Sequence, residues 1–134
     1  NGKYLWKPHL FKALKKDGRT IESYEPSILK EIRISKVAQE MVIQGLEEVI
    51  VAPGGTGSSA RVEGVRVGGK TGSAENPHGE LTHAWFGAVA PLDEPTIAIA
   101  IVVENAGHGG SIAGPIAGKV LRHYFQRKNL NGTP

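Results

Sequence analysis

Two apolar segments joined by a short turn constrain the fold of this chain most strongly. Residues 83–91 and 96–103 each carry apolar side chains on both sides of a two-residue alternation, and a proline-bounded turn separates them. A connection this short allows antiparallel pairing, whereas a parallel crossover needs a dozen or more residues. A strand that is apolar on both sides is typical of a sheet interior covered by helices. The sequence therefore predicts two interior antiparallel strands.

A third strand and two helices complete the expected core. Val65 and Val67 alternate with polar or small residues, which predicts a strand over 64–73. Apolar residues at helical spacing predict a helix over 35–51, which Ser35 caps and whose apolar stripe is core, and another over 114–127. Residues 56–63 predict a glycine- and serine-rich loop. The expected fold class is α+β, with an antiparallel sheet flanked by helices.

The N-terminal segment has the pattern of a hairpin. Residues 4–14 and 20–24 are extended in character, and Asp17-Gly18 between them is a strong turn signal. Lysines and an arginine gather at this turn, where a solvated surface explains them well. With 134 residues the chain has the size of one domain. We expect three regions within it: a hairpin region over 1–26, a helix region over 27–55, and the sheet with its last helix over 56–134.

Composition excludes several classes of function. There is no cysteine, so disulfides and thiolate metal sites are excluded. His78 and His83 lie close together but without a supporting pattern of acids, so no metal site or cofactor is expected. The net charge is only +3 and no basic run alternates with aromatics, so we expect no nucleic-acid partner. No apolar run predicts a membrane span or a signal peptide, and the start at Asn1 suggests a processed or cut chain.

The stretch around Lys70 fits two incompatible motifs. Gly64 to Thr71 matches G-x-x-x-x-G-K-[ST], a phosphate-binding loop, and Lys70-Thr71-Gly72 matches the third signature of serine penicillin-recognising enzymes. A phosphate loop requires a helix that starts at the Lys-Thr pair, and Pro77 and Gly79 oppose one. A strand running through Lys70 is the favoured interpretation. The apolar segment that ends at Glu104 keeps the nucleotide-binding alternative open, because a magnesium-binding strand ends in the same way.

A second short motif is interpreted as coincidental. Ser27-Ile28-Leu29-Lys30 matches S-x-x-K, the pattern of a serine nucleophile and its lysine. That pattern is functional when the serine opens a helix, because the lysine one turn later then faces the hydroxyl. Ser27 instead lies between the hairpin and the next helix. We expect Ser27 not to be a nucleophile.

Three segments together resemble the C-terminal part of class B penicillin-binding proteins. They are Gly69-Lys70-Thr71-Gly72-Ser73-Ala74-Glu75, then His83 to Pro91, then Ile97 to Gly110 with the closing helix. The opening Asn1-Gly2-Lys3-Tyr4 to Leu10, and Gly54-Gly55-Thr56-Gly57, are most similar to elongation-type members. The resemblance covers almost the whole chain.

The resemblance implies a D,D-transpeptidase that cross-links peptidoglycan stem peptides through a serine acyl-enzyme. It also implies inhibition by β-lactams, an anchor in the cytoplasmic membrane with the catalytic domain outside, and other cell-wall synthesis proteins as partners. Lys70 and Thr71 correspond to the residues that bind the carboxylate of D-Ala-D-Ala or penicillin, which suits an ammonium and a hydroxyl. Gly72 lets the acyl group lie against the backbone, and the backbone N–H of Ser73 is one of two oxyanion donors.

Two family motifs are missing from these residues. The family places its nucleophile motif and a Ser-x-Asn motif far upstream of Lys-Thr-Gly, but no Ser-x-Asn occurs here and Ser27 stands too close to Lys70. We therefore expect a C-terminal piece of a transpeptidase domain that is inactive without its N-terminal remainder. A serine β-lactamase or a penicillin-sensing domain shares Lys-Thr-Gly and remains an alternative.

Overall fold

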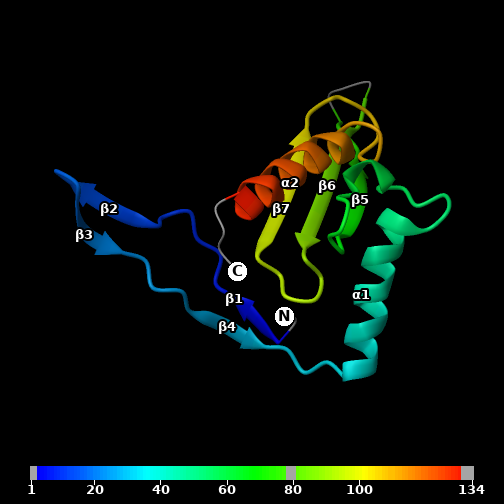
Figure 1. Ribbon diagram of the computed structural model, residues 1–134. Helices are drawn as coiled ribbons and strands as arrows, with labels where there is room; N and C mark the ends of the chain where they lie inside the picture. Colours follow the sequence, from blue (N-terminus) through cyan, green and yellow to red (C-terminus); the bar gives the residue numbers. More distant parts are fainter. Residues whose placement is uncertain (1–2, 78–80, 131–134) are drawn as a thin grey trace. The chain divides into compact units, whose positions relative to one another are not determined.

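The computed structural model describes residues 3–77 and 81–130 (Figure 1). Contacts divide the chain into two compact units, Asn1–Gln39 and Glu40–Pro134, and each unit is described by itself. Residues 78–80, which include His78, and residues 131–134 lie outside the described residues. Within the described ranges, no helix combines the length and the apolar character needed to cross a membrane.

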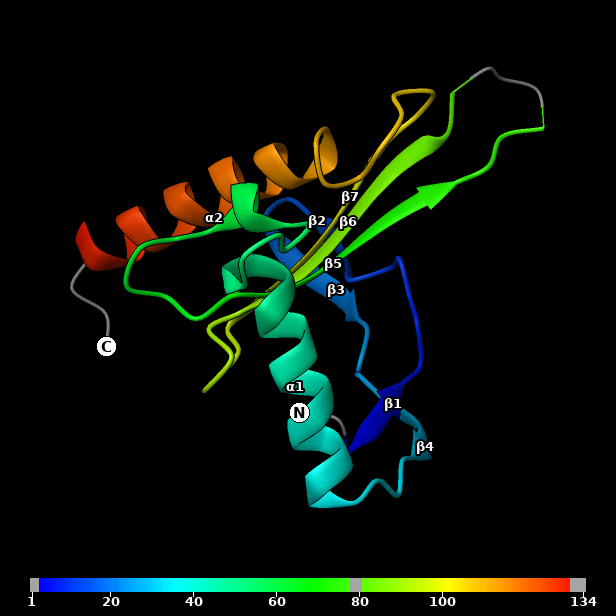
Figure 2. The ribbon, with the colours of Figure 1, turned by 90° about the vertical axis from the view of Figure 1, so that its right-hand side faces the viewer.

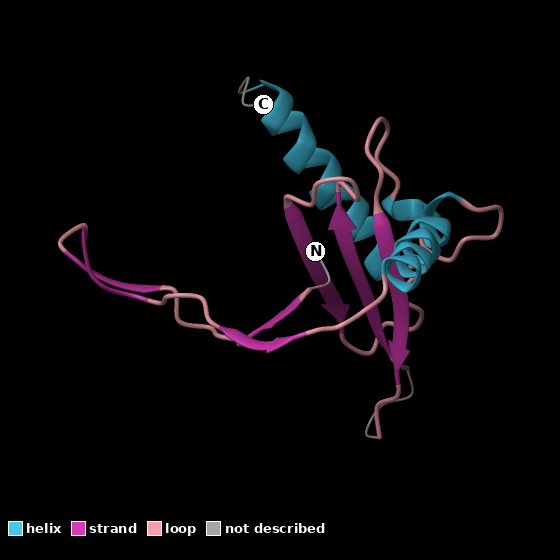
Figure 3. Ribbon diagram, turned by 90° about the horizontal axis from the view of Figure 1, so that it is seen from below, coloured by secondary structure: helices cyan, strands magenta, loops and turns pink. Residues whose placement is uncertain are grey.

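The first unit is a ribbon of paired strands (Figure 3). Its antiparallel pairs are β1 with β4 and β2 with β3. Between the two ladders the His9 ring stacks on Tyr24, with 3.7 Å between ring centroids. The single extended segment expected over 4–14 is thus two strands, because pairing is interrupted around His9. The strands are β1 (Tyr4–Trp6), β2 (Ala13–Lys16), β3 (Arg19–Ser23) and β4 (Ile28–Glu31).

The predicted hairpin turn is confirmed between β2 and β3. Asp17 has φ 51° and Gly18 has φ 77°, so both central residues are left-handed. A two-residue turn of this kind matches the right-handed twist of the flanking strands. Asp-Gly tolerates that conformation, which explains why this dipeptide was a reliable signal.

The second unit is built on one three-stranded antiparallel sheet in the order β5-β6-β7. The expected run of three consecutive antiparallel strands is confirmed. The first strand begins four residues later than expected, because Gly64 (φ 72°) turns the chain and Val62 bridges to Val65. The elements are α1 (Lys36–Val51), which begins in the first unit, then the 3-10 helix η1 (Ser58–Ala60), β5 (Gly68–Ala74), β6 (His83–Ala90), β7 (Ile97–Val103) and α2 (Ala113–Leu130).

Helix α2 covers one face of this sheet (Figure 2). Its buried residues recur every four positions, at Ala113, Ala117, Leu121 and Phe125, and they pack around the fully buried Phe86 of β6. Two buried glycines of the helix let it approach η1 closely, since a Cβ at Gly118 would lie 2.4 Å from the Ser59 carbonyl oxygen. The segment expected to be a loop after α1 therefore contains η1, which contacts α2.

The predicted α2 stripe was only half right. Ile116 and Val120 were expected in the core, but they are 39% and 42% exposed. The apolar side chains that α2 buries form a narrower stripe, at Ala113, Ala117, Leu121 and Phe125.

On the opposite face of the sheet, apolar side chains are exposed within the second unit as far as the structure describes it. Trp85 of β6 and its cross-strand neighbour Val102 of β7 are 44% and 47% exposed. β7 is the last strand of the sheet that the described residues form, so among these residues 96–103 is an edge strand, as we expect for a C-terminal piece without its N-terminal remainder. An apolar strand shows that burial is needed, but it does not show which part of a protein provides it.

Helix α1 begins as predicted and is covered less than predicted. The Ser35 hydroxyl accepts a hydrogen bond from the Ala38 backbone N–H at 3.2 Å, so the N-cap is confirmed. Its apolar stripe was expected to be core, yet Ile50 is the buried residue of the helix and Met41 is 68% exposed. Helical periodicity predicts the helix, whereas its cover depends on a neighbour that the described residues do not provide.

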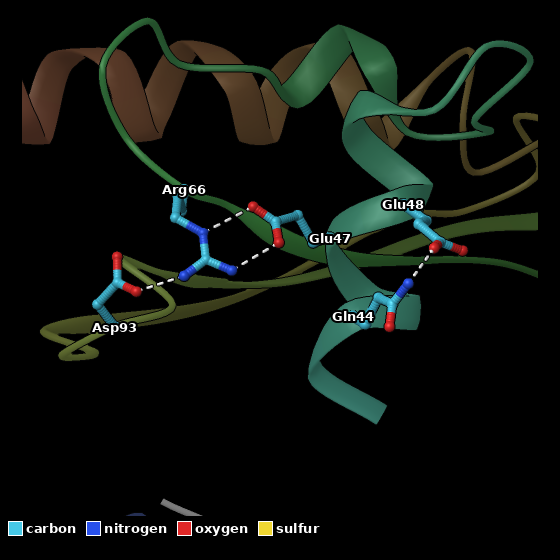
Figure 4. Close-up of polar contacts among 5 residues, drawn as sticks. All are labelled: Gln44, Glu47, Glu48, Arg66 and Asp93. Carbon is cyan, nitrogen blue, oxygen red and sulfur yellow. Dashed lines mark hydrogen bonds and ion pairs between the residues drawn. The ribbon is translucent and has the colours of Figure 1, made fainter. Parts of the chain in front are cut away.

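Arg66 ties three segments of the second unit together just before β5 (Figure 4). Its guanidinium donates two hydrogen bonds, of 2.8 and 2.6 Å, to the Glu47 carboxylate of α1, and a third to Asp93 in the β6–β7 turn. The hydrogen bonds that Arg66 donates hold the pKa of Glu47 below its usual value, and because Glu47 and Asp93 accept them the pKa of Arg66 is raised. The entry to β5 is therefore fixed from both sides.

Candidate functional site

The predicted site residues Lys70, Thr71, Gly72 and Ser73 all lie on β5. This strand pairs with β6 without interruption, from Gly68 opposite Val89 to Ala74 opposite His83. A phosphate-binding loop requires a helix at the Lys-Thr pair, and a paired strand runs through both residues instead. The nucleotide-binding alternative is therefore wrong.

The alternation of the strand separates Lys70 from its neighbours. Thr71 pairs with Phe86 and so shares the face that α2 covers, while Lys70 pairs with Gly87 and leaves the other face. Lys70 is exposed, and its Nζ donates back to the carbonyl oxygen of Thr71. The ammonium thus lies against the backbone beside Thr71 even though the two side chains leave opposite faces.

Thr71, Gly72 and Ser73 line one surface pocket of about 490 Å³. The turn after α1 supplies a second wall through Thr56, and the loop between β7 and α2 supplies a third. None of the described residues that line the pocket is acidic, so it suits an anionic ligand. The remaining lining residues are His108, Gly109, Gly110 and Ser111.

Hydroxyl groups and one imidazole give this pocket its polar contacts. The hydroxyl oxygens of Thr56 and Thr71 are 3.0 Å apart, which is a hydrogen bond in which either can donate. The Ser73 hydroxyl lies 3.5 Å from Nδ1 of His108, a long contact. The Ser111 hydroxyl donates to the His108 carbonyl at 3.1 Å and holds the loop in shape.

Two glycines let that loop lie directly on the pocket. A Cβ at Gly109 would lie 2.1 Å from the Trp85 carbonyl oxygen and 2.4 Å from that of Gly72. A Cβ at Gly110 would lie 2.2 Å from the Thr56 carbonyl oxygen. These separations are far below van der Waals contact, so this wall is formed by backbone and cannot carry a side chain at either position.

A larger surface pocket of about 710 Å³ lies elsewhere in the second unit. Arginines and apolar residues line it, among them Arg61, Arg122 and Val62, together with the paired Arg66 and Glu47. It contains none of the predicted site residues. The smaller pocket is the better candidate, because three of the four motif residues line it. In the larger pocket the charge of Arg66 is already paired with Glu47 and Asp93.

Sequence patterns did not point to Thr56, His108 or Ser111. Their roles depend on segments far apart in the chain that meet at β5, and no local spacing encodes such a meeting. The glycine pair before Ser111 was the available signal, because adjacent glycines mark a close backbone approach.

Among the residues the structure describes, no group of three or more His, Asp or Glu side chains could hold a metal ion. His83 accepts a hydrogen bond from the Asn105 backbone N–H at 3.1 Å.

Comparison with known proteins shows the family of the chain. A family model described as the penicillin-binding protein transpeptidase domain matches residues 1–122. The chain is 39% identical to the peptidoglycan D,D-transpeptidase MrdA of Haemophilus influenzae, over 90% of this chain and 21% of that protein. The crystal structure of the D,D-transpeptidase domain of a peptidoglycan glycosyltransferase from Eggerthella lenta superposes with a TM-score of 0.73 and 30% identity, over 97% of this chain and 30% of that one.

A third similar structure is penicillin-binding protein A of M. tuberculosis as a ceftriaxone acyl-enzyme complex. Its TM-score is 0.69 at 27% identity, over 90% of this chain and 28% of that one. The chain thus spans about a fifth of the length of its curated relative and under a third of these solved chains. The match to the family model extends over most of the chain, so the chain belongs to the family of penicillin-binding protein transpeptidase domains.

Proposed function

We propose that the intact protein is a peptidoglycan D,D-transpeptidase, the activity named for its relative MrdA. A serine hydroxyl attacks the carbonyl carbon between the two D-alanines of a stem peptide, and the terminal D-alanine leaves with a proton. The amine of a second stem peptide then attacks the acyl-enzyme and regenerates the serine. In this proposal β-lactams acylate the same serine, which fits the ceftriaxone and imipenem acyl-enzyme complexes of penicillin-binding protein A of M. tuberculosis.

The observation that carries this proposal is the pocket on β5, in which none of the described lining residues is acidic. Thr71 presents a hydroxyl there, and the Lys70 ammonium, which does not line the pocket, donates to the backbone carbonyl oxygen of Thr71. A hydroxyl and an ammonium on a rigid strand suit the terminal carboxylate of a stem peptide or of a penicillin. In this proposal Gly72 lets the acyl group lie against the strand, and the Ser73 backbone N–H is one of two donors to the oxyanion.

The nucleophile comes from the remainder of the transpeptidase domain in this proposal. Ser27 stands immediately before β4, and Lys30 lies within that strand. Three residues of extended chain span about 10 Å, and an odd offset puts the two side chains on opposite faces. Ser27 therefore lacks the neighbouring lysine that would activate it, and the chain by itself is inactive.

The proposed setting of the intact protein is the cell envelope. The length of the relatives leaves room for a nucleophile-bearing part and a membrane anchor, since this chain spans only a fifth of MrdA. We place the anchor in the cytoplasmic membrane and the catalytic domain outside it, where peptidoglycan stem peptides and other cell-wall synthesis proteins are its partners.

Lys70→Ala in the intact protein tests the carboxylate role. We expect acylation by a fluorescent penicillin to slow by roughly tenfold to a hundredfold, because a hydrogen bond to a charged group is lost. The fold should be retained, since Lys70 is exposed. Lys119→Ala, an exposed lysine of α2, is the matched control and should react at the wild-type rate. Wild-type acylation of Lys70→Ala would show that the assignment is wrong.

The lifetime of the labelled protein separates a transpeptidase from a β-lactamase. A transpeptidase retains the penicilloyl group for hours, whereas a β-lactamase hydrolyses it within one catalytic cycle. We expect a persistent label, which also fits the acyl-enzyme complexes described for similar structures. Rapid loss of label with continued turnover would favour the β-lactamase alternative.

A further inference from the structure

Thr56 and Thr71 form a hydroxyl pair at the pocket. Thr56 follows α1 and Thr71 lies on β5, and their Oγ1 atoms are 3.0 Å apart. The two residues are fifteen positions apart in the chain, so this contact is tertiary. Both residues line the same pocket.

The backbone under Thr56 is fixed from both sides. The next residue, Gly57, is buried and donates its N–H to the Val49 carbonyl of α1 at 2.9 Å. On the other side Gly110 lies so close to the Thr56 carbonyl oxygen that a Cβ there would be 2.2 Å away. The Ser59 hydroxyl donates to the Gly110 carbonyl at 3.2 Å and secures that approach. Thr56 is therefore held in place before any ligand arrives.

We infer that Thr56 is a positioning residue that sets the direction of the Thr71 hydroxyl proton. Each hydroxyl has one proton to donate. If Thr71 donates to Thr56, its proton is used and its lone pairs repel an anion. If Thr56 donates to Thr71, the Thr71 proton is free to point into the pocket, and the first bond polarises the second. A carboxylate in the pocket selects this second arrangement.

This inference rests on the proposed function, because it requires that Thr71 bind a carboxylate. It adds a residue from outside β5 to the recognition of that group. The ligand class is a monoanionic carboxylate attached to a peptide or a β-lactam, and Thr56 acts on it through Thr71 rather than by contact.

The test uses the intact protein and two probes that differ only at the carboxylate. The probes are benzylpenicillin and its methyl ester, and the measured quantity is the second-order rate of acylation. We expect Thr56→Val to slow acylation by benzylpenicillin about three- to tenfold and to leave the rate of acylation by the ester unchanged. Thr56→Ser keeps the hydroxyl and should restore the benzylpenicillin rate. Thr96→Val removes an exposed hydroxyl near the far end of β6 and is the matched control, which should leave both rates unchanged.

A double variant separates positioning from direct contact. If Thr56 acts through Thr71, adding Thr56→Val to Thr71→Val causes no further loss with benzylpenicillin. Losses that multiply would overturn the inference, because Thr56 would then contact the ligand itself. Equal slowing of both probes by Thr56→Val would overturn it as well, since that pattern indicates a general change in the pocket.

The proposed function and this inference fail in different ways. If Lys70→Ala and Thr71→Val slow benzylpenicillin more than the ester while Thr56→Val does not, the inference alone is wrong. If none of the three changes distinguishes the two probes, carboxylate binding at β5 is wrong, and the inference fails with it.

Discussion

At the scale of single residues, the Arg66–Glu47 pair makes the second unit sensitive to acid. Hydrogen bonds from Arg66 lower the pKa of the Glu47 carboxyl. A carboxyl whose pKa is lowered by folding stabilises the fold above its ordinary pKa of about 4.3, and this contribution is lost as pH falls through the lowered value.

We expect Glu47→Gln to reduce the hydrogen-exchange protection of α1 amides in the intact protein at neutral pH. The difference from wild type should shrink as pH falls from about 5 towards about 3, because the wild-type carboxyl then becomes neutral too. Glu94→Gln, in the exposed β6–β7 turn, is the control and should have no effect on α1 at either pH. An effect of Glu47→Gln that is independent of pH would contradict the ionic explanation.

Some residues of the candidate site are placed by the local sequence of one strand, and others are placed by tertiary packing. Lys70 to Ser73 were predicted because they are contiguous and their strand alternates in the sequence. Thr56 and His108 were not predicted, since each reaches β5 from a turn whose path is decided by packing. Successive side chains of a strand leave opposite faces, so Lys70 and Thr71 lie on different faces of β5. The Lys-Thr-Gly motif by itself does not indicate this separation.

At the scale of elements, α2 holds the sheet together through one fully buried leucine. Leu121 has no exposed surface and packs in the cluster around Phe86. We expect Leu121→Ala to lower the free energy of unfolding by about 2–5 kcal/mol, because it removes buried methyl groups and leaves a cavity. The adjacent Val120 is 42% exposed, so Val120→Ala should change stability by no more than about 0.5 kcal/mol. Denaturant unfolding of both variants checks this, and equal losses would show that α2 packs by a different face.

Sequence periodicity predicted which segments become helices and strands, but not how completely each is covered. Both helices form close to the expected bounds, and β5, β6 and β7 pair in the expected order. The exposed Met41 and Trp85 show the limit of such patterns. An apolar stripe reflects burial in the whole protein, and this chain spans about a fifth of its relative MrdA.

At the scale of the whole molecule, we expect the 134-residue chain to be catalytically silent. Incubated alone with a fluorescent penicillin it should acquire no covalent label, because Ser27 and Lys30 are too far apart along an extended strand to act together. Adding the remaining part of the domain should restore labelling. In the intact protein Ser27→Ala should label at the wild-type rate. A stoichiometric adduct on Ser27 would overturn this prediction.

If the proposed transpeptidase function holds, the backbone wall at Gly109 and Gly110 has a consequence for antibiotic resistance. Here neither glycine can gain even a methyl group without colliding with the carbonyl oxygens of Gly72, Trp85 or Thr56. An inhibitor whose acyl side chain hydrogen-bonds to the peptide groups of these two residues would leave the bacterium few ways to evade it. The remaining routes would run through neighbouring side chains such as His108 and Ser111, which also line the pocket.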